Sequence, residues 1–311
     1  MRRGFVLGVL LAVGALSLVA KGYQNPPAAA PGGRANRGGG TPPAALATIK
    51  VRDNLYMITN GGGNTGVFIT ATGVVLVDTK NPNNGQSILD QVRAVTSKPV
   101  TMVINTHTHA DHTGSNEFFK DNVVFVAHEN TKTNMQKMTN FAGDNAKFLP
   151  SRTFKDTMTL GTGADQIVLY YFGPAHTSGD AFVVFPALRA MHAGDAFASR
   201  STPIIDTANG GSAVEYGKTL SKAAAAIKNV DTIINGHITT GPTTFADLQM
   251  YADFNNEFIT WVQSEIMAGK TAEQAAAEYK IPAKYAGYTA GNAAFGGVAG
   301  NINTAYAELK K

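Results

Sequence analysis

The sequence contains no cysteine in its 311 residues. This absence excludes disulfides, lipid-modified cysteines and thiolate metal ligands, so any zinc site has to be built from histidine and carboxylate side chains. Charged residues are also scarce, at 15% of the chain against 44% hydrophobic residues. Such a composition is typical of a globular protein, and the length allows one large domain or two small ones.

The formal net charge of +4 does not belong to the part of the chain that is expected to fold. Five of the 26 Lys and Arg residues lie in residues 1–47, which contain no Asp or Glu, so the rest of the chain carries 21 basic and 22 acidic side chains. A nearly neutral domain lacks the excess of basic residues on which nucleic-acid binding depends. We therefore expect no nucleic-acid partner, and the sequence gives no prediction of the oligomeric state.

One long apolar run occurs, at residues 5–20, and two arginines precede it. This pattern is typical of a signal peptide, which we predict over residues 1–20, with cleavage after Ala20 or after Ser17. The run is marginal for a membrane span, and an uncleaved anchor is the alternative. We expect export to a bacterial periplasm or secretion, with no stable membrane span after cleavage. The following residues, 21–47, are rich in Pro, Gly and Ala, and this composition predicts a disordered linker.

The rest of the chain alternates short apolar runs with helical patterns. We predict strands at 54–59, 65–70, 73–78, 100–105, 123–127, 166–172, 181–185, 189–192 and 232–235, and helices at 86–95, 213–228, 245–267 and 271–280, with a helical turn at 116–119. Strands followed by helix and strand occur twice, which indicates helices packed over sheets. We predict one domain over residues 48–242 and a helical C-terminal extension, 243–311, packed on it.

One short segment has the residue types of a metal site: His107-Thr108-His109-Ala110-Asp111-His112, which holds three of the seven histidines. It follows directly on a predicted strand. In an extended segment His107 and His109, two residues apart, point the same way, while Asp111 and His112 turn onto the next loop. Imidazole nitrogens and carboxylate oxygens suit zinc, so this segment has the ligands for two metal ions.

The other four histidines differ in their setting. His176 and His237 each follow directly on a predicted strand, at the strand ends where sites are built. His192 lies inside a short strand and His128 begins a helix, so we interpret these two as packed or surface histidines.

These residues resemble the metallo-β-lactamase superfamily, whose hallmark is His-x-His-x-Asp-His followed by a distant His, an Asp and a final His. The resemblance covers about residues 48–242 and implies an α/β fold: an αββα sandwich of two mixed sheets flanked by helices. It implies a dinuclear site with one zinc on His107, His109 and His176, a second on Asp111, His112 and His237, and Asp195 as the bridging ligand. Asp78, at the end of a predicted strand, would orient one of the ligands.

The resemblance implies an enzyme, a metal-dependent hydrolase that uses two Zn²⁺, with iron or manganese as other possible metals. A metal-bridging hydroxide would attack a small-molecule ester, thioester, lactone or lactam, and Asp111 would orient it as the catalytic residue. The best-known lactamase subclass has cysteine where Asp195 stands, and redox di-iron members have Glu where His109 stands, so neither pattern fits. The alternatives are a mononuclear iron dioxygenase acting on persulfides and a non-catalytic zinc-binding protein.

Two further features leave alternatives open. Asn64 and the glycines before it predict either a mobile hairpin at the mouth of the site or an ordinary turn. Tyr170, Phe197, Asn209 and Tyr216 are candidates for the pocket wall, and each suits the core or the surface as well.

Overall fold

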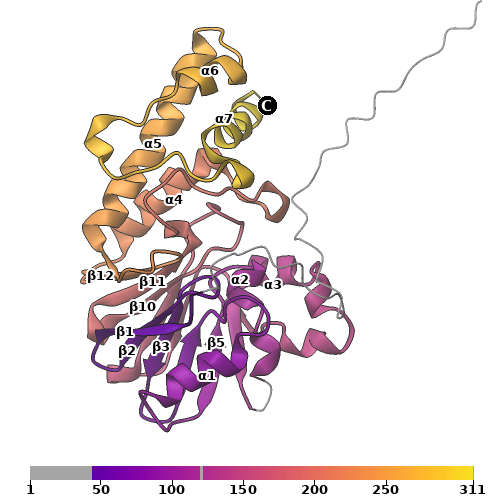
Figure 1. The fold of residues 1–311 in the computed structure, drawn as a ribbon, viewed down its shortest axis with the longest axis vertical. Helices are drawn as coiled ribbons and strands as arrows, with labels where there is room; N and C mark the ends of the chain where they lie inside the picture. Colours follow the sequence, from indigo (N-terminus) through magenta and orange to yellow (C-terminus); the bar gives the residue numbers. More distant parts are fainter. Residues whose placement is uncertain (1–43, 120–121, 311) are drawn as a thin grey trace, which may run out of the picture. The chain divides into compact units, whose positions relative to one another are not determined.

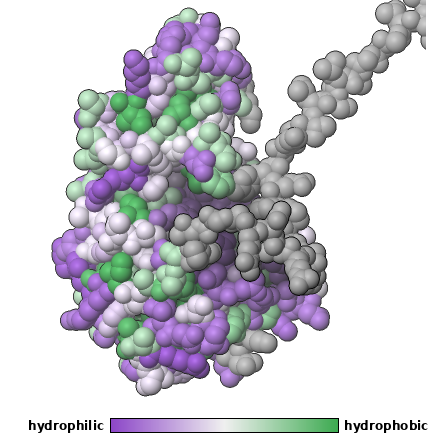
Figure 2. Space-filling view, viewed as in Figure 1, coloured by the Kyte–Doolittle hydropathy of each residue, from purple (hydrophilic) through white to green (hydrophobic). Residues whose placement is uncertain are grey.

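The computed structural model describes residues 44–119 and 122–310, so the predicted signal peptide, 1–20, and most of the predicted linker lie outside the described residues. The linker prediction ran slightly too far, because the first strand begins at Ala47. Within the described ranges, none of the helices combines the length and the apolar character that crossing a membrane requires. On the face seen in Figure 2, hydrophobic side chains form small separate patches among hydrophilic ones.

Thirteen strands in the described residues form two mixed sheets (Figure 1). The first sheet has the order β1 (Ala47–Arg52), β2 (Leu55–Thr59), β3 (Thr65–Ile69), β4 (Val74–Val77), β5 (Val100–Ile104), β6 (Val124–His128) and β7 (Arg152–Phe154). The second has the order β13 (Thr243–Thr244), β12 (Thr232–Asn235), β11 (Ala190–Gly194), β10 (Phe182–Phe185), β9 (Ile167–Tyr170) and β8 (Thr157–Leu160). Strands β4 to β7 are parallel, as are β11 and β12, and the other neighbours are antiparallel.

Strand β4 shows how the first sheet is covered on both faces. All four of its residues are buried. Val75 and Val77 pack in a core shared with the second sheet, whereas Val74 and Leu76 pack in a different core with Ile88. Successive side chains of a strand point to opposite faces, so a strand buried on both sides is a continuous apolar run.

Helices cover the outer face of each sheet and complete the predicted αββα sandwich. The helices of the described residues, not all of which contact a sheet, are α1 (Gly85–Arg93), α2 (Ala110–Thr113), α3 (Glu129–Met135), α4 (Ala213–Ala226), α5 (Phe245–Met267), α6 (Ala272–Glu278) and α7 (Gly297–Leu309). Helix α1 packs on the first sheet through Ile88 and Val92. Helices α4 and α5 cover the second sheet, and α5 to α7 gather at one end of the described part (Figure 1). The fold class predicted from the sequence is confirmed.

Several short elements were missing from the prediction. Strands β1, β7, β8 and β13 and helix α2 were not predicted, and helices α3 and α7 were predicted without bounds, as a helix beginning at His128 and as part of the helical residues 243–311. Strand β7 has three residues and β13 has two, so neither produces a run with a readable period. Helix α7 contains two glycines, which have low helix propensity, and its buried face is set by packing against α6 and α4. The long helix α5 has the predicted bounds, because a capping box of Thr244 and Asp247 marks its start.

Candidate metal centre

The seven predicted ligands come from loops that follow four different strands. The segment His107–His112 follows β5, His176 lies in the loop after β9, Asp195 follows β11 and His237 follows β12. Strands β11 and β12 are parallel, so their carboxyl ends lie at one edge of the second sheet. The structure brings all seven side chains together there.

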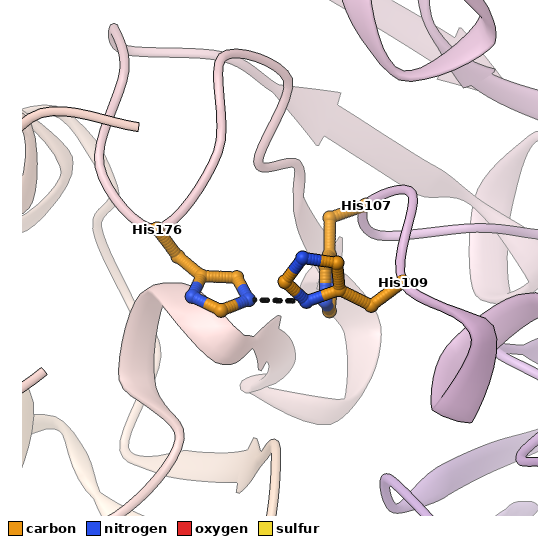
Figure 3. A group of neighbouring side chains, drawn as sticks. All are labelled: His107, His109 and His176. Atoms are coloured by element: carbon orange, nitrogen blue, oxygen red, sulfur yellow. Dashed lines mark hydrogen bonds between the residues drawn. The ribbon is translucent and has the colours of Figure 1, made fainter. Parts of the chain in front are cut away.

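His107, His109 and His176 form the first group, with one nitrogen of each ring within 4.8 Å of the others (Figure 3). His109 Nδ1 lies 2.9 Å from His176 Nε2. His107 Nε2 is buried and has no hydrogen-bond partner among the described residues. A tetrahedral zinc ion with ordinary Zn–N distances would separate two ligand nitrogens by about 3.3 Å, so the convergence of these rings fits a metal ion.

The outer nitrogen of each ring in this group already has a partner. His107 Nδ1 lies 3.0 Å from Thr106 Oγ1, His109 Nε2 lies 2.7 Å from Asp206 Oδ2, and His176 Nδ1 donates to the carbonyl oxygen of Ile204 at 2.7 Å. When these partners accept the proton of the outer nitrogen in a hydrogen bond, the inner nitrogen keeps a lone pair for a metal ion. Outer partners of this kind, together with inner nitrogens that converge, are typical of metal-ligating histidines.

Asp111, His112 and His237 form the second group. His112 Nε2 lies 3.3 Å from His237 Nε2, and Asp111 Oδ2 lies 3.4 Å from His237 Nε2. His112 Nδ1 donates to Asp78 Oδ2 at 2.7 Å. Asp78 therefore occupies the ligand-orienting position that the resemblance implied.

Asp195 lies between the two groups and is 3% exposed. Its Oδ1 is 3.2 Å from His112 Nε2, and its Oδ2 is 3.1 Å from His237 Nε2 and 3.6 Å from His176 Nε2. One carboxylate thus contacts ligands of both groups, as a bridging ligand must.

Asp78, His107 and His112 also lie within 4.8 Å of one another. We do not interpret this set as a metal site. Asp78 Oδ1 accepts from the Thr106 backbone N–H at 2.8 Å, and Oδ2 accepts from Thr106 Oγ1 and from the outer nitrogen of His112. The oxygens of Asp78 are therefore occupied by protein donors.

Burial and neighbouring charges shift the pKa values of these side chains. Burial lowers the pKa of His107 well below its ordinary value and that of His176 to about 4, so both rings are neutral at pH 7. The charge of Asp195 raises the pKa of His237, and against the effect of burial the charges of Asp195 and Asp111 raise that of His112 well above its ordinary value. The charges of His237 and His112 in turn outweigh burial and hold the pKa of Asp195 well below its ordinary value. Since neutral imidazoles and ionised carboxylates bind metal, the first group is ready for a cation, and a cation at the second group would displace protons from His112 and His237.

The two groups differ in exposure. The side chains of His107, His112, His176 and Asp195 are buried and that of His109 is 17% exposed, whereas the side chains of Asp111 and His237 are 33% and 34% exposed. The second group is therefore the more accessible of the two.

The loop before Asn64 is fastened to the body of the protein and does not form a cover over the site. Asn64 is fully buried, and its Nδ2 donates to the carbonyl oxygens of Asn235 and Ile238, both at 3.0 Å. Lys80 Nζ donates to the carbonyl oxygen of Gly63 at 2.8 Å. A Cβ atom on Gly63 would lie 2.1 Å from the ring of His112, so only glycine allows this approach. The loop thus packs against His112 at Gly63 and is held by hydrogen bonds, which favours the ordinary turn over the mobile hairpin.

The other side chains proposed for the pocket wall have supporting positions. Phe197 and Tyr216 are buried in the core over the second sheet, against which Tyr170 also packs. The hydroxyl of Tyr216 donates to the backbone carbonyl of Asp195 at 2.8 Å. Asn209 Nδ2 donates to Asp206 Oδ2 at 2.6 Å.

His128 and His192 are buried and belong to neither ligand group, as expected for packed histidines. His128 Nε2 donates to the Lys155 carbonyl and His192 Nε2 to the Asn64 carbonyl. Sequence reasoning missed Thr106, Lys80 and Asp206. Thr106 lies beside the motif, but Asp206 is 97 residues from His109 and has no sequence signal.

The family model of the Metallo-beta-lactamase superfamily matches residues 58–237, more than half of the chain. The chain therefore belongs to the metallo-β-lactamase superfamily, whose members related to it are mostly metal-dependent hydrolases. It is 27% identical over 199 residues to a type 2 metallo-β-lactamase of Elizabethkingia meningoseptica, covering 60% of this chain and 77% of that protein. It is 25% identical over 211 residues to metallo-β-lactamase IND-1 of Chryseobacterium indologenes, covering 63% of this chain and 86% of the relative.

Solved structures share the fold at lower sequence identity. The sec-alkylsulfatase Pisa1 from Pseudomonas sp. matches with a TM-score of 0.68 and 15% identity, covering 85% of this chain, which in turn spans half of that enzyme. The metallo-β-lactamase DIM-1 matches with a TM-score of 0.56 and 19% identity, covering 68% of this chain and 99% of that protein. The sulfatase match covers 85% of this chain, which is more than residues 48–242 alone can supply. The likeness to the sulfatase therefore includes part of the C-terminal helices.

Proposed function

We propose that this protein is a dinuclear zinc hydrolase that acts on a small-molecule ester, thioester, lactone or lactam. The observation that carries the proposal is the pair of ligand groups around Asp195. In these groups four imidazole rings bond to protein partners through their outer nitrogens and present their inner nitrogens to a common centre. The four rings are those of His107, His109, His112 and His176. Such outer partners are characteristic of metal-ligating histidines.

The donor set consists of nitrogen and carboxylate oxygen, which suits zinc and also accepts iron or manganese. The mononuclear iron alternative needs only the first group of ligands. A buried bridging carboxylate and a complete second group favour two metal ions. When bound, two zinc ions supply hydroxide at neutral pH by lowering the pKa of water from 15.7 to about 7, and they polarise the bond to be cleaved.

Asp195 and Asp111 have different roles in the proposed reaction. Asp195 is buried and supplies a fixed negative charge between the two groups. Asp111 is a third exposed, with Oδ2 3.4 Å from His237 Nε2, so its carboxylate is accessible to solvent beside the second group. A carboxylate in that position accepts a hydrogen bond from the attacking water and holds its proton until the leaving group takes it.

The test is a turnover screen of the mature protein with defined metal content, against β-lactam, lactone, thioester, phosphodiester and sulfate-ester substrates. We expect hydrolysis of one class by the zinc-loaded protein, loss on chelation and recovery when zinc is added back. His109→Ala and Asp111→Asn should abolish it, while Asp144→Asn, at an exposed carboxylate, serves as the control. Full activity of His109→Ala or Asp111→Asn would contradict the proposal.

The same screen separates the alternatives. One iron per chain together with oxygen uptake selects the persulfide dioxygenase. Tight zinc with no turnover on any substrate selects a non-catalytic zinc-binding protein.

Export is a second proposal, supported by the charged and apolar composition of residues 1–20. Fractionation of the bacterial host with N-terminal sequencing of the mature protein tests it. A protein that stays in the cytoplasm with its first residues intact contradicts it.

A further inference from the structure

A loop that supports the metal centre is itself held by the C-terminal helices. We call residues 198–206 the support loop. Four hydrogen bonds join it to residues near or within α7: the Thr289 N–H to the Arg200 carbonyl at 3.1 Å, the Thr202 N–H to the Thr289 carbonyl at 3.0 Å, Thr202 Oγ1 to the Ala290 carbonyl at 2.6 Å, and Asn301 Nδ2 to the Pro203 carbonyl at 2.7 Å.

The support loop also contacts three of the metal-centre histidines. Its residue Ala198 accepts from the backbone N–H of His237 at 2.9 Å. Its residue Ile204 accepts from His176 Nδ1, and Asp206 Oδ2 accepts from His109 Nε2. The loop therefore orients the rings of His176 and His109 directly.

Asn301 lies at the junction of these two sets of contacts. It is a residue of α7 and only 2% exposed, and its amide is bonded to the carbonyl of Pro203, directly before Ile204. A buried carbonyl that loses its donor moves toward another donor or remains unpaired at a cost of about 1–3 kcal/mol. If it moves, it shifts the peptide that leads to the Ile204 carbonyl, and if it remains unpaired, that peptide is no longer held in place by α7.

The backbone of the two segments is shaped for this contact. Gly291 has φ +72°, and a Cβ atom there would lie 2.6 Å from Thr202 Oγ1. Glycine at this position lets the C-terminal segment approach Thr202, where a larger residue would clash with the support loop.

We infer that Asn301 is a positioning residue of the metal centre and that the C-terminal helices are part of the structure that fixes the His109 and His176 rings. The inference rests on the proposed function, because it assumes that these rings bind zinc. It assigns to the C-terminal segment a role in metal affinity in addition to its role in stability.

The experiment measures zinc affinity by competition with a chromophoric chelator, together with the unfolding temperature of the metal-free protein. Asn301→Leu removes the donor while keeping a similar volume. We expect the tighter zinc to bind about tenfold more weakly, the lower end of the range for outer partners of metal ligands. Thr202→Val is a milder change that keeps a similar shape, and it should weaken zinc binding by about threefold. This second variant tests the inference even if Asn301→Leu does not fold.

Thr271→Ala is the matched control. Thr271 belongs to the capping box of α6, in the same C-terminal segment, and its bonds are made within that helix start. This change should lower the unfolding temperature without moving zinc affinity. If the wild type binds two zinc ions and both support-loop variants bind zinc within twofold of it, the inference is wrong and the proposed function stands. If the wild type binds no zinc, both are wrong.

Discussion

The two ligand groups of the metal centre differ in how they are held. In the first group every ring has a protein partner on its outer nitrogen, supplied by Thr106, Asp206 and Ile204. In the second group His112 is buried and bonded to Asp78, but the side chains of Asp111 and His237 are each about a third exposed.

The difference indicates a division of work between the two groups. Rings fixed by outer hydrogen bonds lose little freedom when they bind a metal, so the first group should bind more tightly. The exposed side chains of the second group are the more accessible to solvent, so under the proposed function we expect them to meet the substrate. The expectations below test this division, beginning with the residue that both groups share.

Asp195→Ala removes the carboxylate that contacts both groups and should have the largest effect. Without it, the second group loses its bridging charge, so we expect metal content to fall from two ions to one and turnover to fall by about 10³-fold or more. Metal analysis and steady-state kinetics on the substrate found in the screen measure this. Two tightly bound ions in this variant would contradict a bridging role.

Asp206→Ala tests whether the outer hydrogen bonds of the first group increase its affinity for zinc. Loss of the bond to His109 frees its ring, and loss of such an outer partner costs roughly 10–100-fold in metal affinity. Asp231→Ala, an exposed carboxylate paired with Arg52 and Arg189, is the control. Chelator competition should show weaker zinc binding for the first variant alone. Equal affinities in the two variants would mean that Asp206 does not support His109.

Stepwise chelation compares the two groups directly. The ion of the second group should leave at a chelator concentration about tenfold lower, because its ligands have fewer outer partners. His237→Ala should then keep one tightly bound ion, whereas His176→Ala should keep one weakly bound ion. Release of both ions in a single step from the wild type, with similar affinities in the two variants, would remove the distinction between the groups.

The sequence predicted the ligands because metal chemistry restricts them to a few residue types at strand ends. His107 to His112 follow one buried strand, and His237 follows another, so their convergence follows from the fold. The long helix α5 was equally readable, since it carries a capping box and a sustained apolar face.

The supporting residues were not readable in the same way. Asp206 and Asn301 act through single hydrogen bonds to parts of the chain about a hundred residues away. Such contacts depend on how two loops meet, and no local period or spacing encodes that meeting. Lys80 also lacked a signal, because a lysine after a strand usually reaches solvent, whereas this one is fully buried.

Lys80 supports the second group, and its removal should have the smallest and most specific effect. Its Nζ donates to the carbonyl oxygens of Ile58 and Gly63, each at 2.8 Å, and Gly63 packs on His112. Burial lowers the pKa of Lys80 from 10.5 to about 7, although the charges of Asp78 and Asp111 oppose this. The folded protein therefore disfavours the charged form of this lysine.

The sign of the pH dependence follows from that shift. Between pH 7 and 10.5 the unfolded chain binds more protons at Lys80 than the folded protein does, so this residue makes the free energy of unfolding rise with pH in that window. Below pH 7 both states are protonated and the contribution is constant. Lys80→Met lacks this term, so the difference in stability between wild type and variant should rise from pH 7 to 9.5, with a slope of at most about 1.4 kcal/mol per pH unit.

Urea unfolding of the metal-free proteins at pH 6 to 9.5 measures this difference. Lys98→Met is the matched control, because Lys98 also donates to two backbone carbonyls, those of Thr70 and Ala71, but lies partly exposed at the surface. Its stability should stay parallel to that of the wild type over this range. If the stability profile of Lys80→Met were also parallel to that of the wild type, the pKa of Lys80 would not be lowered by burial. The fixed position of the loop on His112 would then need another explanation.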